Sequence, residues 1–240
     1  MPLTAPAAVP DAPLTALQIA ARNRLVIGIL IISTFVVILN ETIMSVALPT
    51  LMIDLNISAA TAQWLTTGFL LTMAVVIPVT GYLMQRFPTR QIYLLAMSLF
   101  VTGTLLAAIA PGFPILLVAR IVQACGTAIM LPLLMTTVMT LVPPDQRGRT
   151  MGNISIVIAV APAIGPTLSG IILNVLSWRF MFILVLPIAL AALVIGALKM
   201  ANVTEPRRVP LDVLSVMLSA LAFGGLLYAL SAVGEGSSSH

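Results

Sequence analysis

The run at residues 25–48 reads LVIGILIISTFVVILNETIMSVAL, and it decides the fold class. A helix needs about 20 largely apolar residues to cross the ~30 Å hydrocarbon core of a bilayer, and this run is long enough. Glu41 is its only ionisable side chain. The sequence therefore predicts a transmembrane helix that carries one carboxyl group inside the membrane.

Further apolar runs of similar length follow along the chain, and most of the connections between them are short and rich in proline or charged residues. They lie at 62–85, 91–111, 114–142, 150–175, 179–199 and 211–233. We therefore predict an all-α membrane protein in which these runs and 25–48 are transmembrane helices.

The whole chain has the composition of a membrane protein. Of its 240 residues, 60% are hydrophobic and 8% are charged, and its mean hydropathy is +1.15. A soluble domain carries about 25% charged residues, and so few charges could not cover a surface in water. With one cysteine and one histidine, Cys125 and His240, the chain has no internal disulfide, and we predict neither a metal site nor a cofactor.

The lysine and arginine residues indicate the orientation, because they are retained on the cytoplasmic side of a membrane. If the N-terminus is cytoplasmic, Arg179 is the only basic residue near the outer face. The other basic residues outside the spans then lie in cytoplasmic segments: Arg22, Arg24, Arg86, Arg90, Arg147, Arg149, Lys199, Arg207 and Arg208. This bias accounts for the net charge of +4, so no nucleic-acid partner is predicted.

Two ionisable residues fall inside predicted spans, Glu41 and Arg120, and such groups in hydrocarbon are usually functional. Glu41 precedes Pro49 by about 12 Å of helix, and Arg120 follows Pro114 by about 9 Å, so both lie at similar depth. Burial favours the neutral acid, whereas a nearby guanidinium favours the carboxylate. The residues alone are compatible with a proton-carrying pair or with a static ion pair between two helices.

Other polar and small residues extend this pattern. Asn40 adjoins Glu41, and Gln123 and Thr127 share a helix face with Arg120, which predicts a polar cavity or, alternatively, hydrogen bonds between helices. Gly165, Pro166 and Gly170 make the fifth span suited to close packing and bending, with or without motion. Apolar contacts to a substrate, or to lipid and neighbouring helices, are expected from Met44, Met130, Met135, Phe69 and Trp64.

Five stretches in order resemble the motifs of the major facilitator superfamily. Residues 39–49 resemble the first-helix motif of its fourteen-helix drug:proton antiporters, the EmrB/QacA-like branch, and 117–126 resemble the fourth-helix arginine motif. Residues 161–170 are similar to the fifth-helix antiporter motif. Residues 177–182 with Pro187, and then Leu211-Asp212, are similar to the entries of the sixth and seventh helices. Among the subgroups, the lincomycin exporters are the most similar.

The resemblance implies a domain plan. Residues 1–22 would be a flexible cytoplasmic tail, as their Ala- and Pro-rich composition also indicates, and 23–199 would be the six-helix N-terminal bundle of two three-helix repeats. Residues 200–210 would be a cytoplasmic linker, 211–233 a seventh transmembrane helix and 234–240 a flexible end. A C-terminal half is expected as the partner of this bundle, since substrate binds between two such halves.

The resemblance also implies roles for individual residues. Glu41 and Arg120 would couple transport to protons, and the motif with Gly165, Pro166 and Gly170 would favour export. Gly81, Arg86 and Arg90 would belong to the cytoplasmic loop after the second helix. That loop carries Gln85 and Pro88 where the family commonly has aspartate and glycine, so its charge relay is weakened. Ala124 and Ser169 replace motif glycines.

One departure concerns the acid itself. The branch usually has aspartate at the position of Asn40, and here the acid is Glu41, one residue further along. One residue turns a side chain by about 100° around a helix. The sequence therefore leaves open whether Glu41 reaches the same cavity.

The predicted function is proton-coupled export of small lipophilic drugs across the cell membrane, with protons and membrane lipid as the other partners. A non-transporting half-transporter or regulatory membrane partner is the alternative. An intramembrane enzyme is not predicted, because the spans contain no histidine and Lys199 is the only lysine.

Overall fold

A computed structural model describes residues 15–203 together with Leu218, Leu221, Ala222 and Gly225. All elements of the range 15–203 are α-helices: α1 (Ala16–Asp54), α2 (Ala59–Arg86), α3 (Thr89–Ala108), α4 (Phe113–Leu141), α5 (Pro144–Val175) and α6 (Arg179–Lys199). The predicted all-α class is confirmed. Most of the predicted seventh helix (211–233), the end segment (234–240), residues 1–14 of the tail and most of the linker lie outside the described residues.

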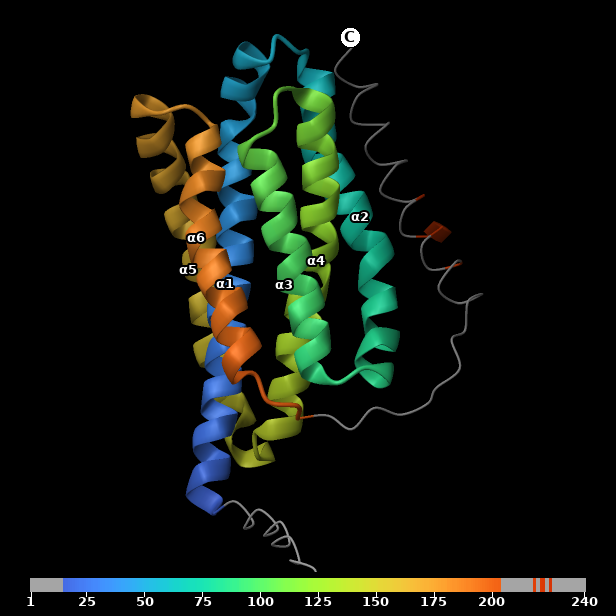
Figure 1. Cartoon of the computed structure of the whole chain (residues 1–240), viewed down its shortest axis with the longest axis vertical. Coiled ribbons are helices and arrows are strands. Elements are labelled where there is room, and N and C mark those ends of the chain that lie inside the picture. Colours follow the sequence, from blue (N-terminus) through green and yellow to red (C-terminus); the bar gives the residue numbers. More distant parts are fainter. Residues whose placement is uncertain (1–14, 204–217, 219–220, 223–224, 226–240) are drawn as a thin grey trace, which may run out of the picture.

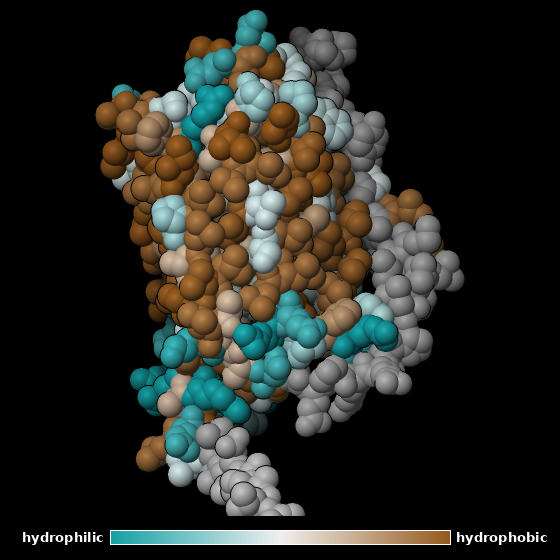
Figure 2. Space-filling view, in the orientation of Figure 1, coloured by the Kyte–Doolittle hydropathy of each residue, from teal (hydrophilic) through white to brown (hydrophobic). Residues whose placement is uncertain are grey.

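The six helices are each long and apolar enough to cross a membrane, and they run side by side along the long axis of the molecule (Figure 1). Figure 2 shows hydrophobic residues over the middle of the visible face and hydrophilic residues toward its two ends. This distribution is the one that a lipid belt between two aqueous layers requires.

Helix α1 begins earlier than the sequence analysis predicted. The Thr15 hydroxyl accepts from the Gln18 N–H at 3.4 Å, and the Gln18 side chain accepts from the Thr15 N–H at 2.8 Å. This capping box satisfies two backbone donors at the helix start. Residues 16–22, predicted as flexible tail, are therefore helical, and α1 extends beyond the other helices at its N-terminal end (Figure 1).

The helices form two three-helix units, α1–α3 and α4–α6, and the contacts between the units are related by exchange of the units. Helix α2 packs on α4 as α5 packs on α1, and α3 packs on α4 as α6 packs on α1. Exchanging the two units therefore reproduces the packing, as expected for two repeats. Helices α1 and α4 meet at the centre, α3 and α6 pack against each other, and α2 and α5 lie at the flanks.

Glycines set the closest helix crossings. A Cβ on Gly103 of α3 would lie 2.7 Å from the Ala119 carbonyl oxygen of α4, and a Cβ on Gly126 of α4 would lie 2.8 Å from the Phe100 nitrogen of α3. Backbone atoms cannot yield as a flexible side chain can. Only glycine fits at these two positions, which bring α3 and α4 together.

Several arginines donate hydrogen bonds to backbone carbonyls at or just beyond the C-terminal ends of helices. Arg147 donates to the Met139 and Val142 carbonyls at the end of α4, and Arg90 donates to the Ala197 carbonyl near the end of α6. Cations are favourable at these negative helix ends. Arg179, near the opposite ends of the helices, donates to the Ala110 carbonyl at 2.9 Å and lies over the Trp178 ring.

Candidate functional site

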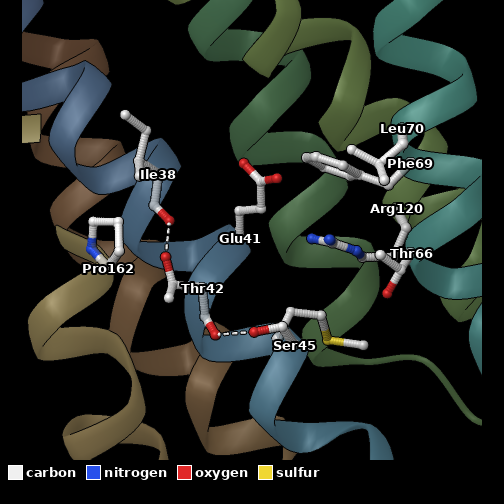
Figure 3. Close-up of a pocket in the computed structure, with 10 residues that line it drawn as sticks. Ile38, Glu41, Thr42, Ser45, Thr66, Phe69, Leu70, Arg120 and Pro162 are labelled. Carbon is white, nitrogen blue, oxygen red and sulfur yellow. Dashed lines mark hydrogen bonds between the residues drawn. The ribbon is translucent and has the colours of Figure 1, made fainter. Parts of the chain in front are cut away.

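A cavity of about 330 Å³ opens among α1, α2, α4 and α5 (Figure 3). Its lining consists of Ile38, Glu41, Thr42, Met44, Ser45, Thr66, Phe69, Leu70, Arg120 and Pro162. Both ionisable residues predicted inside the membrane line this one cavity, although they come from different three-helix units. The shift of the acid by one residue does not turn Glu41 away from it.

The part of α1 beside the cavity uses its hydroxyl groups within the helix. Thr42 Oγ1 donates to the Ile38 carbonyl and Ser45 Oγ donates to the Thr42 carbonyl, each at 2.7 Å. Both bonds are drawn in Figure 3. The Thr42 and Ser45 hydroxyl protons are thus already donated to backbone. Glu41 and Arg120 are the two charged residues of the lining.

Arg120 is buried, with 2% of its surface exposed. Its Nη1 donates to Gln123 Oε1 at 2.7 Å and to Asn40 Oδ1 at 3.4 Å, and its guanidinium carbon lies 4.1 Å from the centre of the Phe69 ring. Gln123 Nε2 in turn donates to Thr104 Oγ1 at 2.8 Å. Two amide oxygens and an aromatic face thus compensate the buried positive charge.

Glu41 and Arg120 are groups of opposite charge that line the same cavity without forming a direct bond. Within the described residues no hydrogen bond or ion pair joins them. Arg120 Nη1 donates instead to Asn40 Oδ1 and Gln123 Oε1. In Figure 3 the carboxyl group and the guanidinium group both point into the space between α1 and α4.

The predicted cavity residues Asn40, Gln123 and Thr127 have other positions. None of them is among the lining residues. Asn40 and Gln123 are buried and hold Arg120, whereas the Thr127 hydroxyl donates to the Gln123 carbonyl within α4 at 2.9 Å. These contacts fit the alternative of hydrogen bonds between and within helices, and a role of the three residues in binding substrate stays a prediction.

The predicted motif residues of α5 differ among themselves. A Cβ on Gly165 would lie 2.7 Å from Thr42 Cβ, so Gly165 brings α5 against α1, whereas a Cβ on Gly170 would meet nothing within 4 Å. Pro166 lies inside α5. Ser169, which replaces a motif glycine, donates to the Ile43 carbonyl of α1 at 3.2 Å. Close packing on α1 is thus a property of Gly165 and not of Gly170.

The predicted cytoplasmic-loop residues lie at one end of the bundle, away from the cavity lining. Arg86 is in the last turn of α2, and a Cβ on Gly81 would meet nothing within 4 Å. The Arg90 N–H donates to Asn202 Oδ1 at 3.2 Å, while the Arg90 side chain binds the Ala197 carbonyl. Arg90 therefore joins the start of α3 to the end of α6.

Comparison with known proteins assigns the family. The sequence model described as Major Facilitator Superfamily matches residues 30–234. The chain belongs to the major facilitator superfamily. It is 47% identical to the lincomycin resistance protein LmrB of Bacillus subtilis over 208 residues, which cover 87% of this chain and 43% of LmrB. It is 33% identical to the multidrug export protein EmrB of Haemophilus influenzae over 196 residues, covering 81% of this chain and 38% of EmrB.

Solved structures of other transporters share this fold. A crystal structure of the peptide transporter POT in complex with sulfate superposes with a TM-score of 0.68 at 17% identity, covering 86% of this chain and 45% of that chain. The predicted membership and its likeness to lincomycin and EmrB-type exporters are confirmed. The chain spans less than half the length of the curated relatives that it matches.

In this superfamily member, several lining residues carried little signal in the sequence. Met44 and Phe69 were predicted as apolar contacts and do line the cavity, unlike Met130, Met135 and Trp64. Thr66, Leu70 and Ser45 were missed. A threonine, leucine or serine in an apolar run is ordinary, so only the packing of the helices identifies these residues as lining.

Proposed function

We propose that this chain is the N-terminal half of a proton-coupled exporter of small lipophilic drugs in the cell membrane. The observation that supports this most directly is that Glu41 and Arg120 line one cavity between α1 and α4. Ionisable groups at membrane depth are costly and usually serve a pathway for protons or substrate. The names of LmrB and EmrB, a lincomycin resistance protein and a multidrug export protein, are consistent with drug export.

The charge of the cavity links proton and drug. With Glu41 ionised, the lining carries one negative and one positive group. With Glu41 protonated, Arg120 leaves a net positive charge, which repels a cationic drug in a cavity of low dielectric constant. Proton uptake from outside therefore releases the drug, and proton loss to the cytoplasm permits the next drug to bind.

A second half is needed for alternating access around this cavity. In the most apolar window of α2 and of α5, 17% of residues are buried inside the bundle, against 56% for α1 and α4. The flanking helices therefore keep wide apolar faces that other membrane helices can cover. We propose that these faces pack on a C-terminal half, and that the N-terminus is cytoplasmic.

The test is accumulation of lincomycin in cells that express the full-length gene product, with wild type compared with Glu41→Gln. We expect the variant to accumulate drug as cells without the transporter do, because the cavity can no longer change charge. Asp54→Asn is the matched control. It makes the same acid-to-amide change on α1, at an exposed residue outside the cavity, and should export as wild type does.

Protein amounts in the membrane are compared by immunoblot so that a loss of export is not a loss of protein. Full export by a well-expressed Glu41→Gln variant would remove Glu41 from the proton path. Export by neither wild type nor Asp54→Asn would instead favour a non-transporting membrane partner.

A further inference from the structure

The guanidinium of Arg120 is hydrogen-bonded on one edge, whereas no described residue is hydrogen-bonded to its other edge, Nε with Nη2. Both of its hydrogen bonds to side chains leave from Nη1. Its Nε is buried and has no hydrogen-bond partner among the described residues. A buried donor is normally paired, so each unpaired one needs an explanation. Here the unpaired donor belongs to a side chain that is itself 2% exposed and lines the cavity.

The Nε/Nη2 edge has a defined geometry. Nε–H and Nη2–H lie side by side in the guanidinium plane and form the fork that binds two oxygen atoms at once. Gln123 holds the opposite nitrogen at 2.7 Å, and Phe69 covers one face of the group at 4.1 Å. The fork cannot turn away without breaking these contacts, so it is fixed in orientation. Figure 3 shows the guanidinium pointing into the space beside Glu41.

The lining itself offers little to fill this edge. Glu41 is the only acid that lines the cavity and is not bonded to Arg120. The Thr42 and Ser45 hydroxyls donate to carbonyls of their own helix. Thr66 adds one hydroxyl oxygen, which is one acceptor and not a pair, and Ile38, Met44, Leu70 and Pro162 supply apolar surface. An acceptor pair for the fork must therefore come from a bound molecule or from a movement of Glu41.

We propose that the Nε/Nη2 edge of Arg120 binds a pair of oxygen acceptors on the exported compound, such as a carboxylate or a carbonyl with a neighbouring hydroxyl. This inference rests on the proposed export function and specifies its substrate class. The compound is an oxygen-bearing amphiphile, with its polar oxygens on Arg120 and its apolar body against Ile38 and Leu70. A lipophilic cation without such oxygens lacks the contact.

The test uses two ligands that differ only at one end. Pentyltriphenylphosphonium and (4-carboxybutyl)triphenylphosphonium share the cation, the aromatic body and the chain length, and the second ends in a carboxylate instead of a methyl group. Binding of each is measured by equilibrium dialysis against the full-length gene product in lipid nanodiscs, without a proton gradient. We expect the carboxylate compound to bind at least about tenfold more tightly, because charge-assisted bidentate hydrogen bonds are strong.

Three variants locate the preference. Arg120→Lys keeps the charge but removes the fork, so the affinity ratio should fall to near one. Arg149→Lys makes the same change at an exposed residue outside the cavity and should keep the wild-type ratio. Glu41→Gln should weaken binding of the pentyl compound, and because it also removes a carboxylate that repels the carboxylate of the second ligand, the ratio should rise. If Arg120→Lys does not fold, as judged by gel filtration, the affinities of the two ligands for wild type and for Glu41→Gln still test the proposal.

Equal affinities of wild type for the two ligands would overturn the proposal, as would an unchanged ratio in folded Arg120→Lys. A preference that appears only in Glu41→Gln would also overturn it, since Glu41 itself would then occupy the Nε/Nη2 edge of Arg120 in the wild type. Because binding is measured without transport, the two hypotheses fail separately. Tighter binding of the carboxylate ligand without drug export in cells would reject the export function and keep the Arg120 binding site. Drug export with equal binding of the two ligands would reject only the Arg120 binding site.

Discussion

At the scale of single residues, Arg120 is held by neutral partners from several helices. Its Nη1 binds Asn40 of α1 and Gln123 of α4, and Gln123 reaches Thr104 of α3. Phe69 of α2 lies against its face. A buried charge without hydrogen bonds is costly, so this network fixes the side chain and also joins four helices around it.

The network predicts a stability effect at Gln123. Gln123→Ala removes the 2.7 Å partner of Arg120 and the donor to Thr104, leaving buried polar groups unpaired. We expect a loss of about 1–3 kcal/mol in the free energy of unfolding, seen as a lower melting temperature in circular dichroism. Gln146→Ala, at an exposed residue in the first turn of α5, should melt as wild type does. Identical melting of the two variants would mean that the network contributes nothing.

At the scale of elements, the crossing of α1 and α5 lies directly beside the cavity. Gly165 packs on Thr42, and Ser169 donates to the Ile43 carbonyl. Thr42 and Ile43 directly follow Glu41 in the chain. A displacement of α5 against α1 therefore acts on the helical turn that carries the acid.

Two glycines of α5 provide a matched comparison of this crossing. In Gly165→Ala the new Cβ would lie 2.7 Å from Thr42 Cβ, and such overpacking costs about 1–3 kcal/mol. We expect a lower melting temperature and reduced drug export. Gly170→Ala meets open space and should leave both unchanged or raise stability slightly, since alanine favours helix over glycine by up to ~1 kcal/mol.

The same two assays, melting and lincomycin accumulation, are applied to both variants. Equal behaviour of Gly165→Ala and Gly170→Ala would show that the close approach of α5 to α1 is not required. A loss confined to Gly170→Ala would contradict the assignment of the tight crossing to Gly165.

At the scale of the whole molecule, hydropathy predicted the six described spans because each residue of an apolar run reports its surroundings independently. Glu41 and Arg120 were identifiable for the same reason, as charges where none is expected. The start of α1 was missed because its signal is a single polar pair, Thr15 with Gln18, in a stretch whose Ala- and Pro-rich composition indicated a tail. Thr66 and Leu70 line the cavity because of the way α2 packs against α4. The sequence of one helix alone does not specify that packing.

The orientation in the membrane is also a property of the whole molecule, and it leads to a labelling experiment. In full-length protein with Cys125→Ala, Pro111→Cys places a thiol between α3 and α4, and Gln146→Cys places one at the start of α5. Both positions are exposed. Arg147 and Arg149 directly follow Gln146 in the sequence, and arginines are retained inside. We therefore expect a membrane-impermeant maleimide to label Pro111→Cys in intact cells and Gln146→Cys only after permeabilisation.

The result also bears on Arg179, the one basic residue that the charge rule leaves outside. Its guanidinium binds the Ala110 carbonyl and stacks on Trp178, so it is held next to Pro111. Outer labelling at Pro111→Cys would place this arginine on the outer side, retained there by local bonds despite the general bias. The reverse labelling pattern would invert the chain in the membrane, and protons entering from outside would then reach Glu41 from the end of the bundle where Arg90 binds α6.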